Sequence, residues 1–257
     1  MVFTLNQDGE SYCVNGSTLT IGEDAITVPE TYREKPVTAV GDSAFARHKM
    51  KRVSLPNTVV SIGESAFYEC TELTSVTVPE KATEILTGAF YGCSSLISVH
   101  LPEGLLRLEE QAFYGGEGLE EISLPDSLQF VGGSAFEDCN ITYNIFETGC
   151  YLGSSQNKYM VLIGTEDNQL VACTVHASTK IVAAGAFVDC ALLTSVTFPR
   201  SVKRIGNYAF VVCPAVSEIV YEGTAEEWNK VEKDEYWFGE LTGLTVRCSD
   251  ASVPINE

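Results

Sequence analysis

Basic residues are scarce in this chain of 257 residues. Lys and Arg number 16 against 35 Asp and Glu, which gives a formal net charge of −19. Binding to nucleic acids and to anionic membranes depends on Lys and Arg meeting phosphate groups. We therefore expect neither kind of partner. One basic cluster, residues 47–52, is interpreted as a solvated turn.

Segments that would place the chain in a membrane are missing as well. No run of about 18 apolar residues is present, so no transmembrane helix is encoded. Residues 1–8 have neither the basic region nor the apolar region of a signal peptide. Two interpretations stay open: a cytoplasmic protein, or a mature fragment whose leader has been removed.

Groups that catalyse reactions near neutral pH are few. His48, His100 and His176 are the three histidines. Motifs for a nucleophile elbow, a zinc protease, a phosphate-binding loop, a dinucleotide fold or a calcium loop are absent. Nine cysteines occur, but none in the Cys-x-x-Cys spacing of metal sites. We expect no enzymatic activity, no cofactor and no metal.

What the chain does have is a repeat. An Ala-Phe pair recurs at intervals of 22, 23, 23, 23, 51 and 23 residues, and the long interval is one repeat enlarged by an insertion of about 28. A proline stands eleven residues before most of these phenylalanines, and a cysteine stands three residues after most of them. The phenylalanines, predicted to be the structural core of the repeat, are Phe45, Phe67, Phe90, Phe113, Phe136, Phe187 and Phe210.

The spacing within one repeat predicts a short strand followed by turns. Val76 and Val78 are two residues apart with Thr77 between them, which is typical of a strand with one buried face. Pro79 then ends the strand, because proline has no N–H for the ladder. A coil of about 23 residues cannot bury enough apolar surface to fold alone. The coils must therefore stack into a solenoid, each covering the next.

The cysteines after the phenylalanines should line the inside of this solenoid as small buried side chains. They are Cys70, Cys93, Cys139, Cys190 and Cys213, with Gly116 at the equivalent position after Phe113. Cys150 and Cys173 flank the insertion, and in an extracellular protein they could form a disulfide.

The repeat resembles the BspA-type leucine-rich-repeat family, known from surface proteins of gut and oral bacteria. Residues 61–79, Ser-Ile-Gly-Glu-Ser-Ala-Phe-Tyr-Glu-Cys-Thr-Glu-Leu-Thr-Ser-Val-Thr-Val-Pro, are close to a consensus repeat of that family. Residues 26–41 resemble its first repeat, and residues 221–229 its closing unit. The resemblance implies a right-handed, β-rich leucine-rich-repeat superhelix. For some members it implies adhesion to host proteins such as fibronectin and fibrinogen. The motif fixes no binding residue.

We expect one domain made of five parts. Residues 1–38 are an N-terminal cap, 39–139 are coils, 140–172 are an insertion shaped as a hairpin, 173–220 are coils again, and 221–257 are a C-terminal cap with both tryptophans. A monomer is expected.

Two surfaces could bind a partner. The outward strand positions carry mostly small hydroxyl residues, and three tyrosines follow the phenylalanines of neighbouring coils. The candidate residues are Tyr68, Tyr91, Tyr114, Ser75, Thr77, Ser98, His100, Glu121 and Ser123. The leading hypothesis is a non-enzymatic module, secreted or at the cell surface of a bacterium, that binds a protein or a glycan. The alternative is a structural spacer without a ligand.

Overall fold

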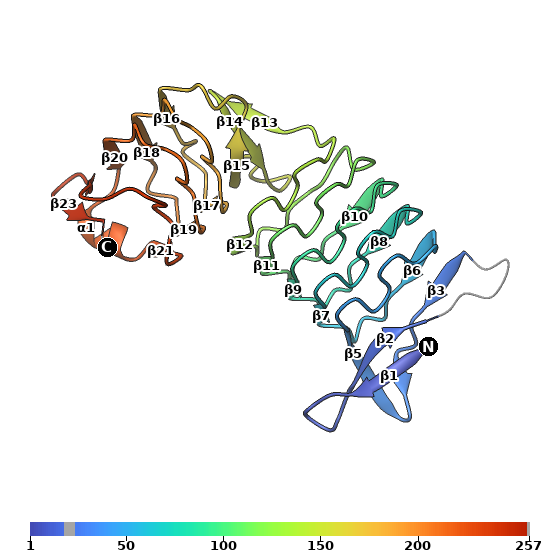
Figure 1. The fold of residues 1–257 in the computed structure, drawn as a ribbon. Coiled ribbons are helices and arrows are strands. Elements are labelled where there is room, and N and C mark those ends of the chain that lie inside the picture. Colours follow the sequence, from blue (N-terminus) through green and yellow to red (C-terminus); the bar gives the residue numbers. More distant parts are fainter. Residues whose placement is uncertain (18–23, 256–257) are drawn as a thin grey trace. The chain divides into compact units, whose positions relative to one another are not determined.

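The computed structural model describes residues 1–17 and 24–255. The chain divides into two compact units. Unit 1 comprises Met1–Leu128 with Ser134–Thr142, and unit 2 comprises Gln129–Gly133 with Tyr143–Glu257. Each is built of stacked β-coils with repeats about 23 residues apart, so the predicted solenoid is confirmed (Figure 1). The single domain expected from the sequence stays a prediction.

Unit 1 contains two sheets, one on each side of its coils. The first runs in the order β1-β2-β5-β7-β9-β11, with β4 beside β5. Its strands are β1 (Val2–Leu5), β2 (Tyr12–Gly16), β4 (Thr31–Tyr32), β5 (Lys35–Val40), β7 (Ser61–Ile62), β9 (Glu84–Ile85) and β11 (Arg107–Leu108). The second sheet runs β10-β8-β6-β3. Its strands are β3 (Ala25–Thr27), β6 (Arg52–Ser54), β8 (Ser75–Thr77) and β10 (Ser98–His100).

Successive coils pair in parallel, as a repeat of fixed length requires. Ser75 pairs with Ser98 and Glu84 pairs with Arg107, each one repeat further along the chain. Among the described strands of this unit, only the β1–β2 and β4–β5 pairs are antiparallel. Each repeat has a second apolar pair after its proline, and the sequence leaves the structure of that pair open. In the fold, this pair ends in a second short strand. From β6 to β11, each coil therefore adds one strand to each sheet.

The interior of unit 1 contains a column of phenylalanine rings. The centroids of successive rings are 5.4, 5.1, 5.2 and 5.8 Å apart and their planes lie within 14° of parallel. The five rings are Phe45, Phe67, Phe90, Phe113 and Phe136, each at most 1% exposed. Backbone hydrogen bonds join the same bends: the N–H of Phe90 donates to the carbonyl of Ala112, one coil on, at 2.8 Å.

Each bend needs left-handed backbone on both sides of its phenylalanine. Gly88 and Gly92, two residues before and after Phe90, have φ of 60° and 67°. Non-glycine residues occupy these positions in other coils, and Val212 has φ of 56°. A β-branched side chain strongly disfavours that conformation. The surrounding hydrogen bonds of the repeat hold the bend in place despite this local cost.

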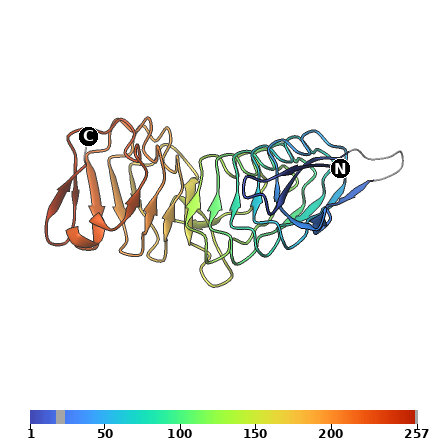
Figure 2. The ribbon, with the colours of Figure 1, turned by 90° about the horizontal axis from the view of Figure 1, so that it is seen from below.

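Unit 2 has the same two-sheet plan. One sheet runs β13-β14-β15-β17-β19-β21 and the other β16-β18-β20-β22-β23; their parallel strands are seen in Figure 2. The first comprises β13 (Asn144–Phe146), β14 (Gly149–Leu152), β15 (Val161–Thr165), β17 (Ile181–Val182), β19 (Arg204–Ile205) and β21 (Glu232–Lys233). The second comprises β16 (Ala172–Thr174), β18 (Ser195–Phe198), β20 (Glu218–Tyr221), β22 (Thr245–Arg247) and β23 (Ser252–Pro254). The unit also includes β12 (Phe130–Val131) and α1 (Ala225–Asn229).

The insertion forms a three-stranded antiparallel meander. Strands β13 and β14 pair through Ile145 and Cys150, and β14 pairs with β15 across the polar turn at residues 153–157. β15 then pairs in parallel with β17 and so joins the meander to the coils. The suggested disulfide is wrong: Cys150 and Cys173 are both free thiols, as are the other seven cysteines.

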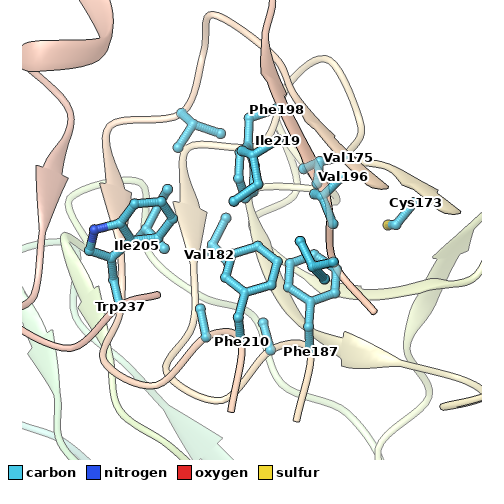
Figure 3. Close-up of a cluster of buried hydrophobic side chains, with 14 of the residues drawn as sticks. Cys173, Val175, Val182, Phe187, Val196, Phe198, Ile205, Phe210, Ile219 and Trp237 are labelled. Carbon is cyan, nitrogen blue, oxygen red and sulfur yellow. The ribbon is translucent and has the colours of Figure 1, made fainter. Parts of the chain in front are cut away.

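The core of unit 2 is aromatic at its C-terminal end. Phe187 and Phe210 continue the stacking pattern with centroids 5.0 Å apart, and Trp237 packs edge-on against Phe210 at 6.0 Å (Figure 3). Trp228 of α1 is 2% exposed and contacts Trp237 at 5.7 Å. The tail therefore closes the apolar end of the last coil.

Candidate interaction surface

The predicted tyrosines of unit 1 come together on the outside of the bends. Tyr68, Tyr91 and Tyr114, which we call the tyrosine ridge, each follow a buried phenylalanine, so the phenylalanine column fixes where each one emerges. Backbone bonds link the same bends, since the N–H of Glu69 donates to the carbonyl of Tyr91 and that of Gly92 to Tyr114, both at 2.7 Å. All three tyrosines are half-buried.

The rings of the ridge cover one another's faces. Tyr68 and Tyr91 are stacked with centroids 4.9 Å apart and planes 16° from parallel, and Tyr91 and Tyr114 at 4.8 Å and 8°. These distances match the spacing of neighbouring strands, which sets the rise from coil to coil. The guanidinium of Arg47 lies 5.8 Å from the Tyr68 centroid. Ring edges and hydroxyls, rather than the covered inner ring faces, are therefore what the ridge presents.

Carboxylates flank the two ends of the ridge. The hydroxyl of Tyr114 is hydrogen-bonded to Asp138, and this bond raises the pKa of Tyr114 to about 12. Burial and the nearby Glu69 carboxylate raise the pKa of Tyr68. Glu69 also accepts from Nε of Arg47 at 2.8 Å. Both tyrosines keep their proton near neutral pH, and both are held in position by these contacts.

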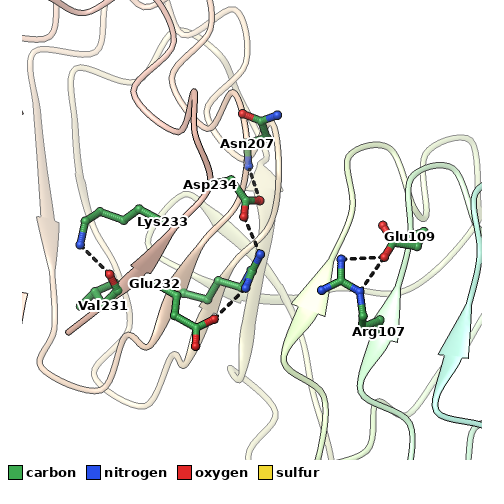
Figure 4. A network of polar contacts seen from close by, with 8 residues as sticks. Arg107, Glu109, Asn207, Val231, Glu232, Lys233 and Asp234 are labelled. Atoms are coloured by element: carbon green, nitrogen blue, oxygen red, sulfur yellow. Dashed lines mark hydrogen bonds and ion pairs between the residues drawn. The ribbon is translucent and has the colours of Figure 1, made fainter. Parts of the chain in front are cut away.

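The later coils of unit 1 are strongly acidic. Between residues 82 and 142 the sequence has ten acidic residues and one basic residue, Arg107. Arg107 is itself paired with Glu109 at 2.7 Å (Figure 4). The acidic residues are Glu84, Glu103, Glu109, Glu110, Glu117, Glu120, Glu121, Asp126, Glu137 and Asp138. The ridge therefore ends in a region of negative potential, which attracts basic partners.

The second predicted surface lies on the strands β8 and β10. Ser75 is opposite Ser98, and Thr77 is opposite His100, all four exposed. His100 lies 3.9 Å from Glu80. Glu121 and Ser123 are exposed too. The prediction that they lie on a strand is wrong. Residues 121–123 form no ladder with β10 and remain irregular.

A profile for the family described as "BspA type Leucine rich repeat region" matches residues 38–156 and 166–238, in six copies. This chain belongs to the BspA-type leucine-rich repeat family. The family identification agrees with the two-sheet coils and with the phenylalanine columns of both units. No curated protein matches this BspA-type chain.

Solved structures of bacterial leucine-rich repeat proteins resemble it. One from Bacteroides ovatus is 21% identical, with 90% of this chain and 65% of that one covered and a TM-score of 0.55. The T. pallidum protein TpLRR is 24% identical, with coverage of 85% and 78% and a TM-score of 0.47. A leucine-rich cell surface protein from Faecalibacterium prausnitzii is 22% identical, with coverage of 91% and 96% and a TM-score of 0.35. The likeness to the B. ovatus protein shows a common fold.

The repeat cysteines of this BspA-type chain form hydrogen bonds between neighbouring coils. The thiol of Cys93 donates to the carbonyl of Phe67 in the preceding coil at 3.2 Å, and that of Cys70 to Phe45 at 3.0 Å. Cys139 and Cys213 repeat the contact. Burial raises the pKa of Cys70 to about 11. These thiols are therefore structural hydrogen-bond donors, and the interval of three residues after each phenylalanine was the signal for them.

Within residues 1–17 and 24–255, no three side chains of His, Cys, Asp or Glu are grouped as a metal would require. The helical part of those ranges includes nothing that could act as a transmembrane span.

Proposed function

We propose that this chain is a non-enzymatic module that binds a protein partner through the tyrosine ridge. Membership of a leucine-rich repeat family supports an interaction role. The geometry of the ridge indicates the kind of partner. Tyrosine edges and hydroxyls on a rigid scaffold give a partner large amphipathic contacts at a small cost in conformational entropy.

The stacking of the ridge favours a protein over a glycan. A sugar ring binds best against an open aromatic face. The inner faces of Tyr68, Tyr91 and Tyr114 are covered by one another, with centroids only 4.8–4.9 Å apart. A protein side chain can instead meet the ring edges and bond to the hydroxyls.

The charge around the ridge favours a basic partner. Residues 82–142 include ten acidic residues and one arginine. Long-range attraction of that sign accelerates the encounter with a positively charged surface, and salt weakens it. We place the protein outside the cell or at the cell surface, as other members of its family are, with adhesion as its role.

Binding measurements on the ridge test this proposal. The chain would be immobilised and exposed to a panel of extracellular matrix proteins, including fibronectin and fibrinogen, and to a glycan array. We expect saturable binding to at least one protein and a loss of affinity as salt is raised. Replacing Tyr68, Tyr91 and Tyr114 by alanine should weaken that binding at least tenfold, because central aromatic residues dominate interface energies.

A matched control comes from the other unit. Tyr208 and Tyr236 form a second stacked pair, with centroids 5.8 Å apart, and are 48% and 46% exposed. Their double replacement by alanine should leave binding unchanged. Thr77→Arg and Ser98→Arg test the strand surface. Loss through these two changes, with the ridge variant still binding, would move the site to the strands. Failure to capture any protein or glycan would favour the structural spacer.

A further inference from the structure

The C-terminal cap of unit 2 contains a cavity of about 360 Å³. Trp228, Trp237 and Phe238 are among the residues that line it, together with Ile255 and Lys233. That volume falls in the range of small-molecule sites, which are mostly apolar with a few polar groups that orient the ligand.

The wall formed by α1 is held in place before any ligand arrives. Thr224 caps the helix by accepting from the N–H of Glu227 at 3.2 Å, and the Glu227 carboxylate accepts from the N–H of Thr224 at 2.8 Å. Trp228 is buried and contacts Tyr221 at 5.2 Å and Trp237 at 5.7 Å. The two indoles are therefore fixed by packing.

Lys233 brings a positive charge to this cavity and has no counter-ion among the described residues. Its Nζ lies 4.4 Å from the centroid of Trp228 and donates to the carbonyls of Trp228 at 2.8 Å and Val231 at 2.6 Å. These carbonyls come from the end of α1 and the turn after it. An ammonium has three protons to donate. Neither a third acceptor nor a carboxylate is within bonding distance of Lys233 in the part of the chain described.

The neighbouring carboxylates are engaged elsewhere. Asp234 bonds to Arg204 and accepts from the backbone N–H of Asn207 at 3.1 Å (Figure 4). Glu235, on the cavity rim, is hydrogen-bonded to the hydroxyl of Tyr236. Burial lowers the pKa of Lys233 to about 8. A half-buried ammonium without a counter-ion is costly, and an anion that entered the cavity would relieve that cost.

We propose that this cavity binds an aromatic carboxylate. The ring would lie against the indoles and Phe238, and the carboxylate would accept from the third N–H of Lys233. Glu235 at the rim repels further negative charge, so the site should favour one carboxylate over a dianion such as phosphate. A free acid in solution and the last residue of a peptide with an aromatic side chain both have this chemistry.

Tryptophan fluorescence tests this proposal directly. The chain has two tryptophans, and both line the cavity. The full chain would be titrated with 3-phenylpropionate, with the uncharged 3-phenylpropanol, and with a short peptide ending in phenylalanine as the free acid or the amide. We expect the tryptophan fluorescence to change saturably as 3-phenylpropionate is added. The alcohol should bind at least tenfold more weakly. Binding of the peptide acid but not its amide would identify a chain end as the source. Binding of 3-phenylpropionate alone would identify a free acid.

Variants of Lys233 separate charge recognition from structural damage. Lys233→Met should weaken binding of the acid at least tenfold and leave binding of the alcohol unchanged. Lys233→Arg should restore part of the affinity for the acid. Lys230→Met is the matched control, because Lys230 is exposed and paired with Glu226. Affinity for the acid should also fall above pH 8, as Lys233 loses its proton. Equal binding of acid and alcohol, or no saturable response, would overturn the proposal. Neither result affects the tyrosine ridge, which belongs to unit 1.

Discussion

The phenylalanine column should be the main source of stability in unit 1, and Phe113→Ala is its sharpest test. Phe113 is 1% exposed and lies between two parallel rings, with Phe90 at 5.2 Å and Phe136 at 5.8 Å. Loss of a buried phenylalanine removes its transfer free energy and leaves a cavity, together about 3–5 kcal/mol. Rigid coils on both sides limit collapse into that cavity, so we expect the upper part of this range.

Urea unfolding followed by far-ultraviolet circular dichroism gives the measurement. A loss of about 4 kcal/mol should move the midpoint by more than about 1 M. Phe45→Ala is the matched control, because Phe45 ends the column and stacks on Phe67 alone among the phenylalanines. Its cost should be smaller by about 0.5–1.5 kcal/mol, the value of one aromatic pair. A midpoint for Phe113→Ala equal to that of the unchanged protein would refute the role of the column.

Three further predictions follow from single sites. Val212→Gly should stabilise the folded state by about 0.5–1 kcal/mol, because it removes a valine from left-handed backbone at a position that is 48% exposed. Asp189 is unbranched and holds the equivalent position, so Asp189→Gly should have little effect on the urea midpoint. Burial lowers the pKa of His176 below 6.5, so the folded state binds fewer protons than the unfolded state, and the free energy of unfolding should fall as pH drops below about 6.5. His176→Gln should remove this part of the pH dependence. An equal slope of unfolding free energy against pH in the variant would contradict the prediction. All nine cysteines should be alkylated in the unfolded, unreduced protein, as mass spectrometry can show, while buried Cys93 should resist alkylation in the native state; a mass short of nine labels would reveal a disulfide.

The sequence was sufficient to predict the coils, because stacking forces equivalent residues to the same depth. Phe67, Phe90 and Phe113 recur at one interval, and each lies in the column. The tyrosine ridge follows from the same rule, since Tyr68 and Tyr91 hold one position in neighbouring coils. Their stacking distance is the strand spacing, so it too could have been predicted.

Features that depend on contacts outside the period could not be predicted in this way. The disulfide between Cys150 and Cys173 was inferred from their flanking positions, which say nothing about the direction of either side chain. The strand expected at Glu121 is absent although β10 ends its sheet and leaves an edge free, so the two-residue alternation alone does not make a strand.

Departures from the period are where function should be sought in such a chain. Stacking explains why a phenylalanine recurs in every coil, but it does not explain Tyr91 at a position where other coils have Ala46, Glu137 or Val188. The same holds for the cap, where no repeat requires Lys233 to lie over an indole with no counter-ion among the described residues. A residue that the neighbouring coils replace freely is not needed for folding. The ridge tyrosines are such residues and Lys233 lies outside the repeat, so mutations of these residues can change binding while the solenoid remains intact.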